Sequence, residues 1–267
     1  MEKIGLIAGN RRFPILFSQA AKKKGCQLVA VGIRGDTSAA LKRYVDKLYW
    51  IGLSDFEKMF EIFKREGVSH VVMAGQISPH RLFSREVTRS KTLQQLLDSL
   101  ADRRADTIFG AIAQQLQERG FTLIDSTTYL EDSLPDKGIL TRHEPDFDCW
   151  EDIYFGFDIA KEVAYLDIGQ TVAVKGKAVV AVEALEGTDN LIRRARTISR
   201  SGFSVIKVSK PKQDARFDIP VVGLVTVKNL VRAKARCLAL EAKKTLFIDK
   251  DISISLANRK GLSIVAI

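Results

Sequence analysis

Short apolar segments that end in glycine alternate with helix-like segments through the first half of the chain. Residues 3–8 form one such apolar segment and close on Gly9, and residues 70–74 close on Gly75. This alternation is typical of a parallel, doubly wound sheet with helices. We therefore predict a Rossmann-like N-terminal domain. Ligands of such sheets bind beyond the carboxyl ends of the strands, where Gly9, Asn10, Gly75 and Gln76 lie.

Apolar periodicity predicts the other elements of this half. Further strands are expected at residues 28–33, 48–51 and 121–124. Helices are expected at residues 14–24, 55–65 and 92–119, the second capped by Ser54 and the third ended by Gly120.

A turn-rich segment at residues 133–138 predicts a boundary between domains of residues 1–133 and 134–267. The second domain is expected to be mixed α/β, because its elements do not alternate regularly. Two β-branched runs around Lys175-Gly176 predict a hairpin over residues 171–182. Further strands are expected at residues 203–208, around 238, at 246–248 and at 263–267, and helices from Thr188, at 226–235 and at 251–259.

The charge balance favours an anionic partner. The chain of 267 residues has 42 Lys and Arg against 32 Asp and Glu, a net charge of +10. These basic residues are scattered and form no nucleic-acid-binding module, so a phosphate-rich ligand is expected and nucleic acid is not. No apolar run is long enough for a membrane span or a signal peptide, so we expect a cytoplasmic protein. Cys26, Cys149 and Cys237 lie far apart and are expected to be buried apolar residues.

The segment 182–195 combines acidic and basic side chains at a predicted helix start. A helix N-terminus binds phosphate oxygens, and carboxylates bind Mg²⁺. The candidates are Gly187, Thr188, Arg193 and Arg194 for the phosphates, with Glu186 and Asp189 for the metal. An alternative is a helix capped by Thr188 or Asp189 that carries a solvated charged face.

A second charged cluster lies in the segment 207–223. If this segment is extended, Asp214, Arg216 and Asp218 point to the same side and could hold a metal and a phosphate together. Lys210 adds positive charge just before them. The alternative is a charged surface loop between two prolines.

Weaker signals lie at two turns. Gln170 precedes the predicted hairpin and could orient a ligand or a water, although a simple turn explains it equally well. The turn at Gly9 has no GxGxxG pattern, which disfavours an NAD-dependent oxidoreductase. The chain also has no GxxxxGK[ST] loop, which disfavours ATP-driven chemistry.

Taken together, these stretches resemble the LpxI family of UDP-2,3-diacylglucosamine pyrophosphatases. The resemblance rests on IAGN followed by FP near the N-terminus, VVMAGQ, LDIGQ, VEALEGTDNLIRRA and KPKQDARFDIPVVG, in the family's order. The family often has glycine after the asparagine of the first turn, where this chain has Arg11. That departure puts the detail of the N-terminal contact in doubt.

The resemblance implies hydrolysis of UDP-diacylglucosamine that depends on Mg²⁺ or another divalent cation, giving UMP and lipid X. It also implies a step of lipid A biosynthesis at the cytoplasmic face of the inner membrane, and a homodimer with the substrate between two domains. In this hypothesis Asp214 and Asp218 bind metal or activate water, with Glu186 and Asp189 as further metal ligands. The residues expected to hold phosphate oxygens are Arg216, Arg193 and Lys210.

Two other functions remain open. The same fold and site could act on a different nucleotide-diphosphate sugar, because sugar and acyl selectivity leave no local motif. The chain could also be a non-enzymatic protein that binds anionic ligands through its net charge.

Overall fold

The computed structural model describes the chain except residues 1, 79–80, 82–86, 88–89 and 103. It divides into two compact units, each with its own sheet and apolar core. The first comprises residues 1–131 and 214–218, and the second residues 132–213 and 219–267. A short segment of the second half of the sequence therefore belongs to the first unit.

Sheet A of the first unit has five parallel strands in its described part, in the order β3-β2-β1-β4-β5. The strands are β1 (Lys3–Ala8), β2 (Gln27–Ile33), β3 (Lys47–Ile51), β4 (His70–Ala74) and β5 (Thr122–Leu123). The chain adds β2 and β3 on one side of β1 and then returns to add β4 and β5 on the other. The predicted parallel, Rossmann-like sheet is confirmed, and its strand order reverses between β1 and β4.

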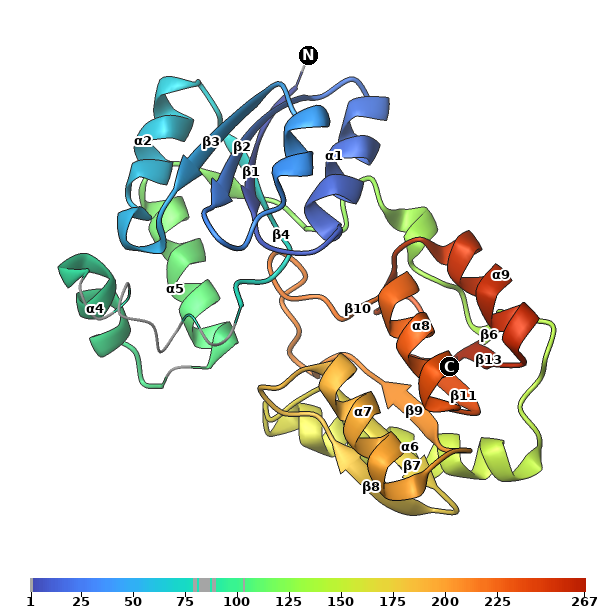
Figure 1. The fold of residues 1–267 in the computed structure, drawn as a ribbon. Helices are drawn as coiled ribbons and strands as arrows, with labels where there is room; N and C mark the ends of the chain where they lie inside the picture. Colours follow the sequence, from blue (N-terminus) through green and yellow to red (C-terminus); the bar gives the residue numbers. More distant parts are fainter. Residues whose placement is uncertain (1, 79–80, 82–86, 88–89, 103) are drawn as a thin grey trace. The chain divides into compact units, whose positions relative to one another are not determined.

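Helices cover both faces of sheet A (Figure 1). They are α1 (Phe13–Lys23), α2 (Lys58–Arg65) and α5 (Ala105–Glu118), with the 3₁₀ helices η1 (Ala39–Arg43) and η2 (Leu53–Asp55), whereas α4 (Lys91–Asp98) is drawn away from the sheet. Successive residues of a strand face opposite sides of a sheet. Val29 and Val31 of β2 accordingly pack with Phe60 and Phe63 of α2, while α1 packs on β2 from the other side.

The prediction of one helix over residues 92–119 is wrong, because two helices, α4 and α5, occupy this stretch. Between them the Asp102 carboxylate accepts hydrogen bonds from the Arg104 backbone N–H at 3.0 Å and from Thr107 Oγ1 at 2.7 Å. An aspartate that bonds nearby backbone in this way competes with a continuous helix and favours a new helix start.

Ser54 is not a helix cap, contrary to the prediction. It lies inside η2, and α2 begins four residues later at Lys58 with no capping side-chain hydrogen bond at Glu57. The segment before α2 is wound as 3₁₀ helix, which moves the start of the α-helix along the chain.

Sheet B of the second unit is mixed and has the order β6-β13-β11-β9-β7-β8. Strands β9, β11 and β13 are parallel, and β7 runs antiparallel to both β8 and β9. The strands are β6 (Gly138–Ile139), β7 (Thr171–Lys175), β8 (Ala178–Val182), β9 (Ser204–Lys207), β11 (Cys237–Leu240) and β13 (Ser263–Ala266), while β10 (Val221–Val222) pairs separately with β12 (Leu246–Phe247). The predicted mixed α/β fold and the hairpin at Lys175-Gly176 are confirmed.

Sheet B also lies between helices. α6 (Phe147–Tyr165) packs on one face, and α7 (Thr188–Ser199), α8 (Leu224–Ala233) and α9 (Lys250–Lys260) pack on the other. The alternation of strand residues fits both layers, since Ile206 packs with α6 and its neighbour Val205 packs with the opposite layer. The sequence analysis did not predict α6.

Helix α6 approaches the sheet closely at Gly156. A Cβ atom on this residue would lie 2.6 Å from Ile206 Cδ1 and 2.9 Å from Val174 Cγ2. Cys149 and Cys237 are fully buried in the same layer, and Cys26 is buried in the first unit, as predicted for apolar residues. Within the described ranges, none of the helices combines the length and the apolarity that a membrane span requires.

Candidate active site

The carboxyl ends of β1 and β4 are held together by backbone hydrogen bonds. Gly9 N–H donates to the Ala74 carbonyl at 2.8 Å, and Asn10 N–H donates to the Gln76 carbonyl at 2.7 Å. A Cβ on Gly9 would lie only 2.5 Å from the Gln76 carbonyl oxygen, so the approach requires glycine. The structure thus brings the predicted residues Gly9, Asn10, Gly75 and Gln76 together at the point where the strand order reverses.

Arg11 follows this turn in a left-handed backbone conformation, with φ of 63°. Glycine adopts that conformation without steric cost, whereas other residues adopt it rarely. The glycine that the family often has at this position therefore suits the backbone found here.

A chain of contacts starts at Asn10 and links three polar residues that were not predicted from the sequence. Asn10 Nδ2 donates to Ser78 Oγ at 3.1 Å, and Ser78 Oγ donates to Asp36 Oδ1 at 2.5 Å. Arg81 Nη1 lies 3.2 Å from Asp36 Oδ2. Each of these residues follows the end of β2 or β4, so the sequence signal that found Gly9 and Gly75 extends to Asp36 and Ser78.

A second polar cluster lies in the other unit, where β9 ends and β7 begins. The buried Lys207 ammonium is 3.0 Å from Thr188 Oγ1, 3.2 Å from Thr171 Oγ1 and 3.7 Å from Glu183 Oε2. Thr188 Oγ1 also donates to Glu183 Oε1 at 2.7 Å. Burial alone would raise the pKa of Glu183, but the Lys207 charge and the hydroxyl donors outweigh it and lower this pKa.

Gln170 and Glu241 border this cluster. Glu183 Oε2 accepts from the Gln170 backbone N–H at 3.4 Å, and Gln170 Oε1 is buried without a hydrogen-bond partner among the described residues. Glu241 Oε2 accepts from the backbone N–H of Ser209 at 2.8 Å and from its hydroxyl at 2.9 Å, and it pairs with Lys161 at 3.0 Å. Burial opposes ionisation of Glu241, but these donors and Lys244 lower its pKa.

The predicted phosphate and metal residues near α7 have partners within the second unit. Glu186 is paired with Arg194 at 2.6 Å, and Asp189 Oδ1 accepts from Asn229 Nδ2 at 3.0 Å. Gly187, with φ of 81°, stands at the N-cap position without a side-chain cap, so the predicted caps by Thr188 or Asp189 are wrong. Thr188 is instead the first residue of α7.

Arg193 and Lys210 complete the predicted residues of the second unit. Arg193 is exposed on α7. Lys210 forms an ion pair with Asp167 at 2.7 Å, and its side chain is only 11% exposed. Glu183 and Lys207 lie in the two charged segments that the sequence singles out, but their pairing was not predicted. Glu241 was missed, because it is a single charged residue after an apolar strand with partners far away in the sequence.

The acidic segment 214–218 folds as a turn, so the extended arrangement that would point Asp214, Arg216 and Asp218 to the same side does not form. Asp218 N–H donates to the Asp214 carbonyl at 2.9 Å. Arg216 forms a two-point ion pair with Asp214, with Nε–Oδ1 at 2.9 Å and Nη2–Oδ2 at 2.6 Å, and this pair lowers the pKa of Asp214. The segment is anchored in the first unit, because the Ala215 carbonyl accepts from both N–H and Oγ of Ser126.

Among the residues that the structure describes, no three His, Cys, Asp or Glu side chains gather closely enough to enclose a metal ion. The four predicted metal residues belong to both units, with Asp214 and Asp218 in the first and Glu186 and Asp189 in the second. Their assignment to a metal stays a prediction.

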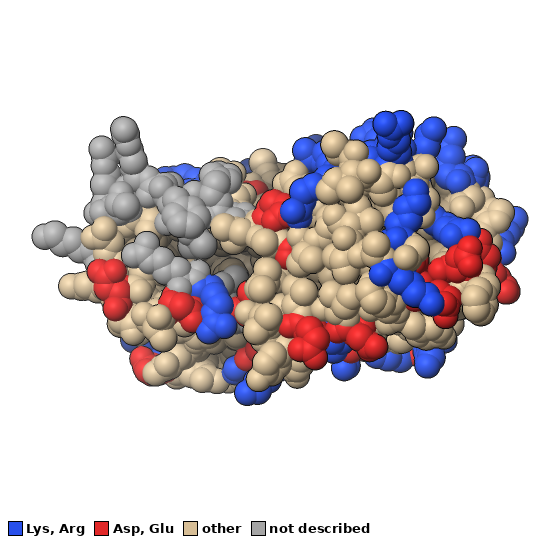
Figure 2. Space-filling model, turned by 90° about the horizontal axis from the view of Figure 1, so that it is seen from below, with Lys and Arg blue, Asp and Glu red and all other residues tan. Residues whose placement is uncertain are grey.

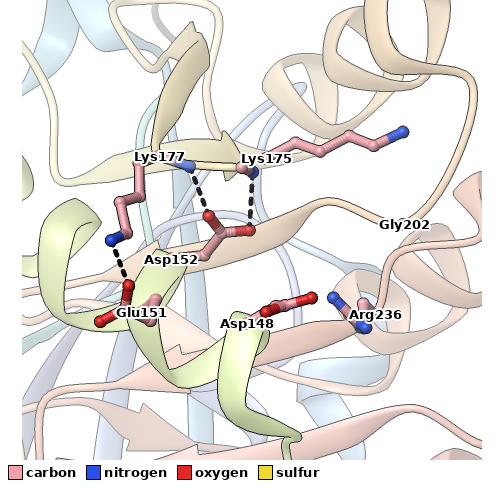
Figure 3. Close-up of a pocket in the computed structure, with 8 residues that line it drawn as sticks. Asp148, Glu151, Asp152, Lys175, Lys177, Gly202 and Arg236 are labelled. Carbon is pink, nitrogen blue, oxygen red and sulfur yellow. Dashed lines mark hydrogen bonds and ion pairs between the residues drawn. The ribbon is translucent and has the colours of Figure 1, made fainter.

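A hollow of about 380 Å³ in the second unit lies away from these clusters (Figure 3). It is bordered by the β7–β8 turn and by residues that precede β9 and β11. These segments lie at the opposite end of sheet B from Lys207. The buried Asp152 accepts there from the backbone N–H groups of Gly176 at 3.1 Å and Lys177 at 2.7 Å. Its charged groups hold the hairpin turn, so we do not place the active site there.

Basic side chains lie in separate groups on the face drawn in Figure 2, with acidic side chains between them. A nucleic-acid surface normally presents a continuous basic stripe. The distribution on this face therefore follows the scattered pattern seen in the sequence.

Two family models match the chain. The LpxI N-terminal domain matches residues 3–133, and the LpxI C-terminal domain matches residues 136–265. A curated relative, the UDP-2,3-diacylglucosamine pyrophosphatase LpxI of Caulobacter vibrioides, is 28% identical over 278 residues. That match covers 100% of this chain and 98% of the relative.

Likeness to solved structures is low. The biotin carboxylase subunit of pyruvate carboxylase has a TM-score of 0.30 and 14% identity, covering 75% of this chain and 41% of that chain. The N5-carboxyaminoimidazole ribonucleotide synthetase of Thermotoga maritima has a TM-score of 0.25 and 15% identity, covering 70% and 43%. The chain spans less than half the length of these proteins.

Proposed function

This chain belongs to the LpxI family, and we propose that it is a UDP-2,3-diacylglucosamine pyrophosphatase. The proposed reaction is attack of water on the α-phosphorus, which gives UMP and 2,3-diacylglucosamine 1-phosphate (lipid X). The observation that carries the proposal is the full-length match to a relative of that name, together with both family domains in order.

Hydrolysis of a diphosphate requires that its negative charge be neutralised before water can attack. We assign this task to a helix N-terminus and to basic side chains of the sites described above. Thr188 and Gly187 stand at the start of a 12-residue helix, whose dipole favours phosphate oxygens. The further candidates that would contact phosphate oxygens are Arg193, Arg194, Lys210 and Arg216.

We propose that Asp218 positions or deprotonates the attacking water, with Asp214 beside it. Arg216 holds Asp214 ionised and fixes its orientation through the two-point ion pair. Because Asp218 N–H is bonded to the Asp214 carbonyl, the two carboxylates come from one tight turn. A rigid turn of this kind can keep a reacting group in place.

We propose that Mg²⁺, or another divalent cation, assists this reaction. Mg²⁺ in phosphate chemistry is typically held by one or two carboxylates, waters and the substrate phosphates, so an enclosing protein cage is not required. Asp214 and Asp218 offer hard oxygen atoms within one turn and fit that pattern. Asp214, Glu186 and Asp189 each already have a partner, Arg216, Arg194 and Asn229 respectively, with which a cation would have to share their oxygens. When bound, the cation would neutralise charge on the diphosphate.

The lipid substrate supports one further proposal, and the family resemblance suggests another. A protein that takes a diacylated substrate must approach a membrane, and the net charge of +10 favours anionic headgroups, so we propose peripheral contact with the cytoplasmic face of the inner membrane. We also propose a homodimer. Flotation with anionic and with neutral vesicles tests the first, and light scattering of the purified protein tests the second.

The proposed function is tested by incubating the purified protein with detergent-dispersed UDP-2,3-diacylglucosamine and following UMP. UMP and lipid X should appear with added Mg²⁺ and stop after EDTA. Other UDP-sugars, tested in parallel, examine the alternative that the site acts on a different nucleotide-diphosphate sugar. Turnover of those sugars without turnover of the diacylated substrate would replace the proposal.

A further inference from the structure

The side-chain amide of Asn10 is oriented by a chain of hydrogen bonds whose donors and acceptors can be assigned. A carboxylate only accepts, so the 2.5 Å contact between Ser78 Oγ and Asp36 Oδ1 uses the serine proton. The Ser78 hydroxyl then has only acceptor capacity left. Its 3.1 Å contact with the Asn10 amide must therefore use the NH₂ group of Asn10.

Asp36 is well placed to impose this direction. Its side chain is 1% exposed, and it also accepts from the Ser78 backbone N–H at 3.2 Å and pairs with Arg81. These contacts join the loop after β2 to the loop after β4. The Ser78 hydroxyl is thereby fixed as a donor to Asp36, which leaves the Asn10 amide one orientation.

The consequence is an acceptor without a donor. Asn10 Oδ1 is buried and receives no hydrogen bond from the part of the chain that the structure describes. The residue as a whole is half-buried, at the carboxyl end of β1. Buried carbonyl oxygens normally have a partner, so this atom is suited to a donor that arrives with a ligand.

We infer that Asn10 Oδ1 accepts a hydrogen bond from the nucleoside half of the substrate, with Ser78 and Asp36 as positioning residues. The inference rests on the proposed function. A phosphate oxygen is itself an acceptor and cannot satisfy Oδ1, which excludes the diphosphate at this atom. The reversal point of a doubly wound sheet is where nucleotides bind, and uridine offers donors at uracil N3–H and at the ribose hydroxyls.

The test uses the full-length protein and UMP, the proposed product, as the probe. Calorimetry would compare UMP with N3-methyl-UMP, 2′-deoxy-UMP and 3′-deoxy-UMP, each of which lacks one donor. The wild-type protein should bind one of these analogues at least 10-fold more weakly than UMP, and that analogue identifies the donor. In Asn10→Ala the difference between UMP and that analogue should vanish.

Ser78 variants separate positioning from a general structural role. Ser78→Ala should lose the same discrimination as Asn10→Ala, because the amide is then free to turn over. Ser78→Thr keeps a hydroxyl and should therefore retain the discrimination between UMP and that analogue. Thermal unfolding would establish that all variants are folded, and in turnover KM should rise with little change in kcat.

Equal binding of all four nucleotides by the wild type would overturn the inference, as would unchanged discrimination in Asn10→Ala. Hydrolysis of UDP-2,3-diacylglucosamine by the same wild-type preparation separates this failure from that of the proposed function. Turnover together with unchanged discrimination would remove only the role of Asn10. If the preparation neither turned over the substrate nor bound UMP, both the role of Asn10 and the proposed function would be contradicted.

Discussion

Gly75 and Gly25 have nearly the same backbone φ, +85° and +81°, but different surroundings. A Cβ on Gly75 would lie 2.6 Å from the Asn10 carbonyl oxygen, whereas a Cβ on Gly25 would have no atom within 4 Å among those described. The left-handed conformation makes both alanine substitutions unfavourable. Only Gly75→Ala also forces two loops apart.

Gly25→Ala should cost about 1 kcal/mol for the left-handed backbone alone. Gly75→Ala should cost about 1–3 kcal/mol more, because the loops must move, and it should weaken UMP binding as well. Urea unfolding of both variants measures the difference. Equal losses of stability would show that the two loops accommodate a methyl group and that their close approach is not constrained.

Lys207 and Glu183 are both nearly buried, with side chains 7% and 9% exposed. Removing one charge of such a pair leaves the other buried without compensation, so Lys207→Met should cost about 3 kcal/mol at pH 7. Glu183→Gln combined with Lys207→Met should cost less than Lys207→Met alone. A double variant less stable than Lys207→Met would contradict a coupled pair.

The same pair predicts that the stabilities of the wild type and of Lys207→Met depend on pH in opposite directions. The folded pKa of Glu183 is lowered from its ordinary 4.5, so the stability that its ionised form contributes is present above pH 4.5 and is lost as pH falls through the folded pKa. Without the Lys207 charge, we expect burial to outweigh the remaining donors and raise this pKa, so that stability is instead lost as pH rises above 4.5. The stability difference between wild type and Lys207→Met should therefore shrink from pH 7 to pH 4, as measured by denaturant unfolding.

At the level of elements, the sheet of the first unit could be predicted because its strands are short apolar runs, three of which, β1, β3 and β4, are followed directly by glycine. Helix α6 could not, since Gly156 interrupts its pattern and aromatic residues such as Phe147 and Tyr154 lie on its exposed side. Its helical state depends on packing against Ile206, a contact distant in sequence. The break between α4 and α5 depends on the hydrogen bonds of Asp102, which apolar periodicity does not report.

Gly156 and Gly110 provide a matched pair of glycines inside helices. Gly110→Ala in α5 should stabilise the protein by about 0.5–1 kcal/mol, because alanine favours the helix and its Cβ meets no described atom within 4 Å. Gly156→Ala should destabilise it by about 1–3 kcal/mol, because the methyl group would press on Ile206 and Val174. Thermal unfolding shifts of the same sign would contradict the close packing of α6.

The candidate site could be predicted where chemistry is local in the sequence. Gly9, Asn10, Gly75 and Gln76 were found because they directly follow two strands that the fold places side by side. Asp214 and Arg216 were also singled out, but the same-side arrangement considered for an extended segment does not form, because a turn bonded to Ser126 occupies these residues. The pairing of Lys207 with Glu183 joins separate strands and has no signature in either segment.

At the scale of the whole molecule, the segment 214–218 lies within the second half of the sequence but belongs to the first compact unit. Asp218→Asn should reduce turnover by at least 100-fold while leaving thermal unfolding nearly unchanged, as expected for loss of a general base or metal ligand. Asp136→Asn is the matched control, because its side chain is 83% exposed and pairs with Lys243 on the surface. Turnover of Asp218→Asn close to that of the control would remove Asp218 from the reaction.

The most direct measurement is hydrolysis of UDP-2,3-diacylglucosamine in ¹⁸O-labelled water with Mg²⁺, followed by mass spectrometry of both products. Attack on the α-phosphorus predicts one ¹⁸O atom in UMP and none in lipid X. Label in the lipid phosphate would contradict the proposed site of attack, and the absence of both products from folded protein would contradict the proposed function itself.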